Sequence, residues 1–430
     1  MLFFSGMLWH RDLLAMAGRL FYYYSMKNES QVCQVKGRSY LDWAATAIPD
    51  EKIQDAFMSL GPNSGKGIMD YPYWGNPSSL HAEGRAAREA LENARSRCAR
   101  ILGVLPETLY FTSGGTESNA LILHSLLQRK GKLRLLYSGT EHPSVRGNCL
   151  KLERLNIPIG VIGTEKDGRV SEGTLSRALE KYADTRFIAV MGVNNETGSL
   201  TEIQTLVSLV RSSQKQSSRP VHFHSDLVQA LGKVPMDLSG WDLDSAAFSA
   251  HKLGGPRGIG LLYLKKSVET LYSGGEQERG IRPGTENTMG AIALSQLLER
   301  RADPEIVRVE EENARNRFKY LISELRKINR CALIPEDREE EDLRFSPWIL
   351  QARFRDIPGA VMVRALDDEG VAVSTGSACS SMSPERPVLA AMGVDKAGQI
   401  EGIRISQGWS TDISAMDALL SAVKKVLSYL

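Results

Sequence analysis

Short apolar runs alternate with amphipathic stretches along most of the chain. The apolar runs predict strands at residues 108–112, 133–137, 187–193, 221–224, 245–248 and 259–264. Apolar residues at helical spacing predict helices at residues 83–102, 118–128, 175–182 and 203–214. Strands that alternate with helices over such a length are typical of an α/β protein, so we expect a mostly parallel sheet with helices on both faces.

The pattern changes after about residue 300. A long charged helix is predicted over residues 304–328, an acidic loop follows at 336–342, and shorter strands and helices continue to the end. We therefore expect a large domain over residues 39–300, which includes an N-terminal arm, and a smaller α/β domain over residues 301–430.

Residues 1–38 do not share this organisation and are predicted to be an extension. The first nine residues are almost wholly apolar and basic residues follow them, which is the reverse of the order in a secretory signal. The uncharged runs are shorter than the roughly 18 residues of a membrane-spanning helix. We expect a loose tail, or translation that starts at Met26; the alternative is a mitochondrial presequence, because basic residues outnumber acidic ones here.

Composition narrows the class of protein. The 430 residues include 53 Lys and Arg against 51 Asp and Glu, so the net charge of +2 argues against direct nucleic-acid binding. The five cysteines are widely spaced and form no CxxC pair, which favours a reducing, cytoplasmic location over a disulfide framework or a structural zinc site: Cys33, Cys98, Cys149, Cys331 and Cys379. His222 and His224 would share a strand face as metal ligands, but no third ligand is near in sequence, so no metal is expected.

One candidate phosphate site follows the predicted strand at residues 108–112. Gly114 and Gly115 come next, and Thr116 opens a helix whose first backbone N–H groups lack partners. Such a helix start suits an anion, although a Gly-Gly pair before a helix also occurs as an ordinary turn.

Two further residues stand at the ends of predicted strands. Asp226 closes the run at 221–224, where it serves either as a helix cap or as the partner of a buried cation. Lys252 lies between a strand and a Gly-Gly-Pro turn, where a desolvated lysine forms a Schiff base more readily than a solvated one. Together with the phosphate loop, these residues describe a pyridoxal 5′-phosphate (PLP) site in which Asp226 pairs with the pyridinium nitrogen.

These segments resemble the class V aminotransferase family and, within it, the group I cysteine desulfurases. The resemblance runs from about residue 40 to residue 424, through residues 40–46, 75–79, 141–143, 194–198, 226–229, 249–252, 282–285, 374–379 and 403–406. It implies a fold-type I PLP enzyme with a mostly parallel seven-stranded sheet and a smaller C-terminal domain. It also implies a homodimer that converts L-cysteine to L-alanine and leaves a persulfide on Cys379. The sulfur would then pass to an acceptor protein of iron–sulfur cluster assembly or tRNA thiolation.

The resemblance implies roles around the cofactor ring. Lys252 would bind the cofactor and move the Cα proton, and His142 would stack on the ring and act in acid–base steps. Asp226 would keep the pyridinium nitrogen protonated. Asn195 and Gln229 would hydrogen-bond the phenolic oxygen of the ring.

Phosphate and substrate contacts follow from the same resemblance. The phosphate would be held by Gly115, Thr116, Ser249 and His251, with Thr285 supplied by the partner subunit. Arg404, helped by Asn76, would grip the substrate carboxylate.

Cys379 distinguishes a desulfurase from other reactions of the family. A lone cysteine is often a small core residue, but this one stands among Ser, Thr, Gly and Ala, as in a mobile loop, and its thiolate would be the nucleophile. The alternatives are a selenocysteine lyase, a class V aminotransferase, and a non-catalytic partner subunit; the presence of Lys252, Asp226 and Cys379 disfavours the last.

Three departures from the family pattern stand out. The segment after Cys379 is about one residue shorter than usual, and no long C-terminal tail for docking a scaffold follows, which leaves the acceptor open. Gly115 replaces an alanine that many relatives have, and this change is expected to matter little.

Overall fold

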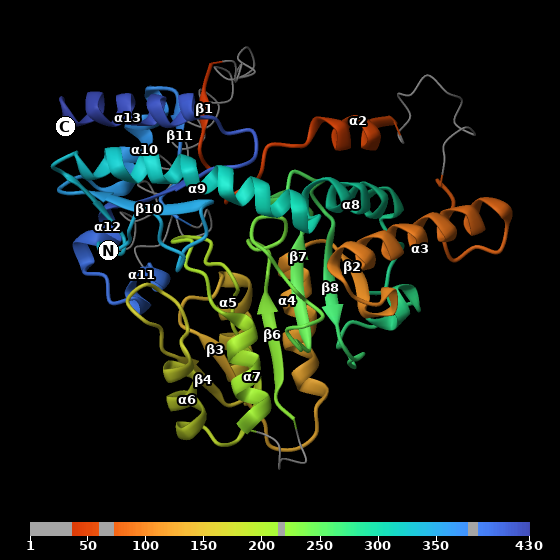
Figure 1. Ribbon diagram of the computed structural model, residues 1–430. Coiled ribbons are helices and arrows are strands. Elements are labelled where there is room, and N and C mark those ends of the chain that lie inside the picture. The colour runs from red at the N-terminus through yellow and green to blue at the C-terminus, as the bar shows by residue number, and fades with distance from the viewer. Residues whose placement is uncertain (1–36, 60–72, 214–219, 377–385) are drawn as a thin grey trace, which may run out of the picture. The chain divides into compact units, whose positions relative to one another are not determined.

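Figure 1 shows a computed structural model that describes residues 37–59, 73–213, 220–376 and 386–430. Residues 39–430 form one compact unit. Within the described ranges, none of the helices combines the length and the apolar character that crossing a membrane requires.

The centre of this unit is a seven-stranded sheet. Its strands are β2 (Leu109–Thr112), β3 (Arg134–Ser138), β4 (Ile159–Ile162), β5 (Thr185–Ala189), β6 (His222–Asp226), β7 (Ser245–Ser249) and β8 (Gly260–Leu264). They lie in the order β2-β8-β7-β6-β5-β3-β4. Only β8 runs antiparallel to its two neighbours, and the other pairs are parallel. The predicted mostly parallel α/β fold is therefore confirmed.

Helices cover both faces of this sheet (Figure 1). Those of the large sheet region are α2 (Glu51–Ser59), α3 (Ala82–Leu102), α4 (Gly115–His124), α5 (Pro143–Arg154), α6 (Glu172–Lys181), α7 (Ile203–Ser213) and α8 (Thr288–Arg301). Adjacent strand residues belong to different cores: Leu136 packs with α3, α6, α7 and α8, whereas Leu135 packs with α4 and α5. Most strand residues are buried on both faces because each face is covered.

Local signals explain where some of the elements begin and end. Helix α3 starts at the N-cap His81 and ends at Gly103, whose φ of 67° is a left-handed conformation that glycine adopts without strain. Four short 3₁₀ turns connect other elements: Pro106–Thr108, Ser125–Gln128, Ala250–Lys252 and Gln277–Gly280.

Several predicted boundaries differ from the structure, and one strand of the central sheet was not predicted. Strand β5 ends at Ala189 rather than at residue 193, because the chain leaves the sheet to form the loop that carries Asn195. Strand β4 was not expected, since its run Ile-Gly-Val-Ile is short and contains a glycine. Helix α4 begins at Gly115, three residues before the predicted start, so the helix terminus itself lies at the glycine pair.

The C-terminal part has a sheet and a core of its own (cyan to blue in Figure 1). Its elements are α9 (Pro304–Arg326), β9 (Cys331–Leu333), β10 (Ile349–Phe354), α10 (Gly359–Asp368), β11 (Val371–Ala372), α11 (Pro387–Ala391), α12 (Lys396–Glu401), β12 (Gly402–Ser406) and α13 (Ile413–Leu427). Strands β12, β10 and β9 form an antiparallel sheet. The N-terminal strand β1 (Ser39–Tyr40) pairs with β11, and Leu41 joins this core, so the predicted arm packs with the C-terminal elements. The division into two domains at residue 300 stays a prediction.

Candidate active site

A pocket of about 510 Å³ lies where the central strands end. Strands β2, β3, β5, β6 and β7 point their carboxyl ends to one edge of the sheet, which is where open α/β sheets bind ligands. Ten predicted residues line this pocket: Gly115, Thr116, His142, Asn195, Asp226, Gln229, Ser249, His251, Lys252 and Arg404.

One end of the pocket is built to hold an anion. Helix α4 begins there, and its N-cap Gly114 has a φ of 147°, in a region that favours glycine. The first N–H groups of a helix and its positive end both favour a phosphate. Ser249, at the end of β7, and Ser113 add hydroxyl groups. Arg257 also lines the pocket and was missed from the sequence, where its only signal was a cation just after a Gly-Gly-Pro turn.

Gly115 is closely packed at this end of the pocket. A Cβ atom built on Gly115 would lie 2.4 Å from Cγ2 of Val228. Val228 lines the pocket, and its backbone N–H donates to Oδ1 of Asp226 at 3.0 Å. An alanine at this position would require Val228 to move, and the expectation that the change matters little stays a prediction.

We expect Gly115→Ala to weaken PLP binding by roughly tenfold, since displacement of Val228 costs about 1–3 kcal/mol as overpacking does elsewhere. Equilibrium dialysis of the apoprotein against PLP measures this. The double variant Gly115→Ala/Val228→Ala removes the clashing methyl groups and should bind within about twofold of the wild type. An unchanged affinity in the single variant would show that Val228 moves without cost.

The other end of the pocket presents a buried carboxylate beside a histidine. Asn119 Nδ2 donates to Oδ2 of Asp226 at 2.7 Å. Nδ1 of His142 accepts from the backbone N–H of Ser144 at 3.1 Å, so in the neutral ring the proton is on Nε2. Burial lowers the pKa of His142, and Lys252 and Arg404 lower it further, whereas Asp226 opposes them. His142 is therefore neutral near pH 7.

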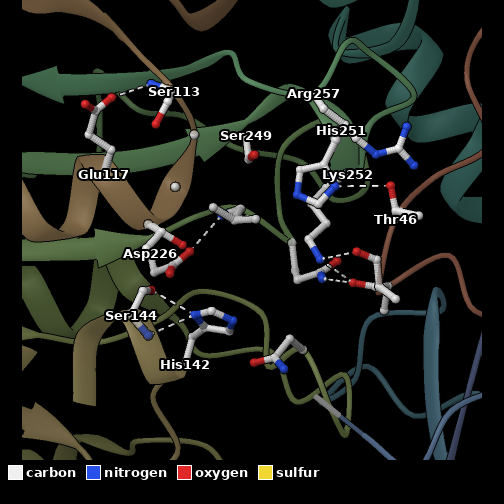
Figure 2. A pocket seen from close by; sticks show the side chains of 18 of the residues that line it. Thr46, Ser113, Glu117, His142, Ser144, Asp226, Ser249, His251, Lys252 and Arg257 are labelled. Atoms are coloured by element: carbon white, nitrogen blue, oxygen red, sulfur yellow. Dashed lines mark hydrogen bonds between the residues drawn. The ribbon is translucent and has the colours of Figure 1, made fainter. Parts of the chain in front are cut away.

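Lys252 lies across the pocket from Asp226 and His142, in the turn that follows β7 (Figure 2). Its Nζ donates to the carbonyl oxygens of Ala44 at 2.6 Å and Ala45 at 2.7 Å. Next to it, Nδ1 of His251 lies 3.2 Å from Oγ1 of Thr46. Burial and the charge of Lys252 lower the pKa of His251 to about 4. The segment 44–46 therefore completes this wall of the pocket.

The side-chain amides of Gln229 and Asn195 also line the pocket. Nε2 of Gln229 donates to the Ala44 carbonyl at 2.9 Å, and its Oε1 accepts from Nζ of Lys233 at 2.7 Å. Oδ1 of Asn195 is buried and has no hydrogen-bond partner among the described residues. A buried polar atom without a protein partner is typical of a site that takes a polar ligand.

Arg404 reaches the pocket from β12 of the C-terminal part. Its side chain is only 1% exposed, and its guanidinium donates to the Asn195 carbonyl and to Oδ1 of Asp42, both at 2.8 Å. Nε of Arg404 is buried without a partner among the described residues. Because Asp42 balances its charge, Arg404 is held in place before any ligand binds.

Two predicted residues of the described ranges are not brought to this pocket. Asn76 and Thr285 line a second cavity of about 360 Å³, and Oδ1 of Asn76 accepts from the Ser78 backbone N–H at 2.9 Å. The expectation that Asn76 assists Arg404 is not met within one chain, because the two residues line separate cavities. Cys379 lies outside the described residues.

The donor set of the pocket fits PLP. A helix terminus with hydroxyl groups suits the phosphate, Asp226 suits a ring N–H, and Lys252 suits an aldehyde carbon. Among the described residues, no group of three or more His, Cys, Asp or Glu side chains is placed to bind a metal.

The comparison with known proteins agrees with this arrangement. The family model described as aminotransferase class-V matches residues 39–419. The chain belongs to this family. It is 33% identical over 405 residues to the cysteine desulfurase IscS of Dictyoglomus turgidum, and the match covers 92% of this chain and 96% of that protein.

Solved structures of family members have the same fold. A NifS-like protein superposes with a TM-score of 0.80 at 29% identity, over 91% of this chain and 100% of the other. SspA, solved in complex with cysteine, gives a TM-score of 0.70 at 26% identity, over 86% of this chain and 98% of the other. The chain is thus a PLP-dependent enzyme whose relatives include cysteine desulfurases.

Proposed function

We propose that this chain acts as a cysteine desulfurase on L-cysteine and that the residues named above have the roles given below. The observation that carries the proposal is the convergence of Lys252, Asp226, His142 and Arg404 on one pocket with a phosphate-binding helix terminus. The bound cofactor supplies an electron sink for the substrate carbon.

Each residue then has a task that follows from its position. Lys252 Nζ holds the cofactor and takes the Cα proton of the substrate. The Asp226 carboxylate, which Asn119 holds, would accept the ring N–H, and His142, whose Nδ1 accepts from Ser144, would pack on the ring. The Arg404 guanidinium binds the substrate carboxylate.

Cys379 would take the sulfur. Its Sγ thiolate forms an S–S bond with the substrate sulfur as the Cβ–S bond breaks, and the electron pair of that bond goes to the substrate carbon, which is protonated to give alanine. Ser374, five residues before it, exchanges backbone hydrogen bonds with Arg404. Gly376 packs so closely that a Cβ there would lie 2.8 Å from Oε2 of Glu196, next to Asn195. The described residues that precede Cys379 therefore lie beside Arg404 and Glu196.

The partners belong to the same proposal. A homodimer is supported by the second cavity, where Thr285 lies beside half-exposed Trp74 and Tyr73 rather than in this chain's own pocket. The persulfide sulfur would pass to an acceptor protein of iron–sulfur cluster assembly or tRNA thiolation. A cytoplasmic location is supported by the described cysteines Cys98, Cys149 and Cys331, which are all free thiols.

One assay tests the function. Purified holoenzyme is mixed with L-cysteine and a reducing thiol, and alanine and sulfide are measured. Equal amounts of the two products support the proposal, whereas the absence of both overturns it. Rates measured in parallel with L-selenocysteine as the substrate distinguish a desulfurase from a selenocysteine lyase. Transamination without release of sulfide would identify an aminotransferase.

Arg404→Lys should raise KM for cysteine by roughly ten- to a hundredfold, because the ammonium group of lysine cannot make the paired hydrogen bonds of a guanidinium to a carboxylate. The affinity for PLP should stay within about twofold, since Arg404 contacts substrate rather than cofactor. Steady-state kinetics with holoenzyme gives the split between KM and kcat. A change confined to kcat would show that Arg404 does not bind the substrate.

A further inference from the structure

Asp226 stands at the end of a continuous chain of hydrogen bonds that runs behind the pocket. Strand β6 places His222, His224 and Asp226 on one face, since side chains alternate along a strand. Ser245 on β7 pairs in register with His224, and Asn119 on α4 fills the space between His224 and Asp226.

The chain begins at Arg129. Nη2 of Arg129 lies 3.3 Å from Nδ1 of His222, and Nε2 of His222 lies 2.8 Å from Oγ of Ser245. The same Oγ lies 2.8 Å from Nδ1 of His224. Nε2 of His224 lies 2.9 Å from Oδ1 of Asn119, whose Nδ2 is 2.7 Å from Oδ2 of Asp226.

These hydrogen bonds can all run in one direction, from Arg129 to Asp226. A guanidinium only donates, so Nδ1 of His222 accepts. Burial lowers the pKa of His222 well below its usual range and that of His224 to about 3, so each ring is neutral and carries one proton. His222 therefore donates from Nε2 to Oγ of Ser245. With the Ser245 hydroxyl donating to Nδ1 of His224, His224 donates from Nε2 to Oδ1 of Asn119.

This direction fixes the orientation of the Asn119 side-chain amide. Its oxygen is committed to His224, so its two N–H groups point to Asp226 and to Oγ of Ser144, which is 2.9 Å away. Oγ of Ser144 in turn lies 2.8 Å from Nδ1 of His142. If His224 held its proton on Nδ1, Asn119 would turn its NH₂ group to Nε2 and set its oxygen against the Asp226 carboxylate, so that two acceptors would face each other.

We propose that Asn119, His224, Ser245 and His222 are positioning residues that keep an N–H donor facing the Asp226 carboxylate by fixing which edge of the Asn119 amide points to it. The inference rests on the proposed role of Asp226 toward the ring nitrogen of PLP. It adds to that role a set of neutral, hydrogen-bonded side chains that begins at His222, outside the pocket. Hydrogen bonds that all point in one direction strengthen one another, and this chain of hydrogen bonds ends at the Asp226 carboxylate.

The test compares two fully buried serines on neighbouring strands. Ser245→Ala breaks the chain, whereas Ser225→Ala removes a hydroxyl that donates to the Val190 carbonyl at 2.8 Å and faces the other side of β6. Each holoenzyme is loaded with PLP labelled with nitrogen-15 in the ring, and the NMR shift of that nitrogen reports its protonation. PLP affinity and the thermal midpoint of each apoprotein are measured in parallel.

We expect Ser245→Ala to move the ring-nitrogen signal toward the unprotonated position and to weaken PLP binding by roughly three- to tenfold. Ser225→Ala should keep the wild-type signal even though both variants lower the thermal midpoint. Asn119→Asp should also displace the signal from its wild-type position, since it replaces the Nδ2 donor to Asp226 with a carboxylate.

Two results would overturn the inference alone: a wild-type signal in both Ser245→Ala and Asn119→Asp, or the same displacement in Ser225→Ala as in Ser245→Ala. A wild-type protein that binds no PLP would instead overturn the proposed function, and the inference with it.

Discussion

Lys252→Ala is expected to abolish alanine formation from L-cysteine, with a loss of roughly a thousandfold or more, because the variant lacks both the cofactor-holding amine and the base for the Cα proton. Borohydride treatment of the wild-type holoenzyme should fix PLP to the peptide that carries Lys252, and mass spectrometry detects the added mass. The same treatment should leave the variant unmodified.

Lys252→Arg is the matched control. Nζ of Lys252 donates to the carbonyl oxygens of Ala44 and Ala45, and an arginine keeps a cation and donors beside them. The arginine variant should therefore recover most of any thermal stability that the alanine variant loses, while it stays inactive. Alanine release by either variant at a rate near that of the wild type would contradict the assignment.

The residues whose place in the pocket follows from the order of the strands could be predicted from the sequence. Lys252, Asp226 and the Gly114-Gly115 pair each come just after a predicted strand, and parallel strands bring such positions to one edge. Arg404 lies far along the chain on another sheet, so only the family resemblance pointed to it.

What the sequence missed has physical reasons. The carbonyl groups of Ala44 and Ala45 contact Lys252 through the backbone, and backbone groups leave no mark in a sequence. Asn119 reads as an ordinary polar position on a helix, and only its complete burial shows that it joins Asp226 to His224. The cost of a methyl group at Gly115 depends on Val228, more than a hundred residues away, so it follows from the fold rather than from the motif.

The separate placement of Asn76 and Thr285 shows a different limit of prediction from sequence motifs. A motif shared with a family does not say which subunit's pocket its residues complete. Here both residues line a cavity apart from the pocket that holds Lys252 and Asp226. We therefore propose that Asn76 shares the role predicted for Thr285, that of serving a partner subunit.

Cys379→Ala is expected to retain PLP affinity within about twofold and to lose alanine and sulfide formation by roughly a hundredfold or more, because sulfur has no nucleophile to accept it. The matched control is Cys331→Ala. Burial raises the pKa of Cys331 to about 12, so its thiol stays protonated near pH 7 and its loss should leave turnover unchanged. After a single turnover without added thiol, mass spectrometry should find one extra sulfur atom on the Cys379 peptide of the wild type and of Cys331→Ala. Sulfide release at the wild-type rate from Cys379→Ala would place the sulfur acceptor elsewhere and leave the Lys252 chemistry intact, since the two residues act on different atoms of the substrate.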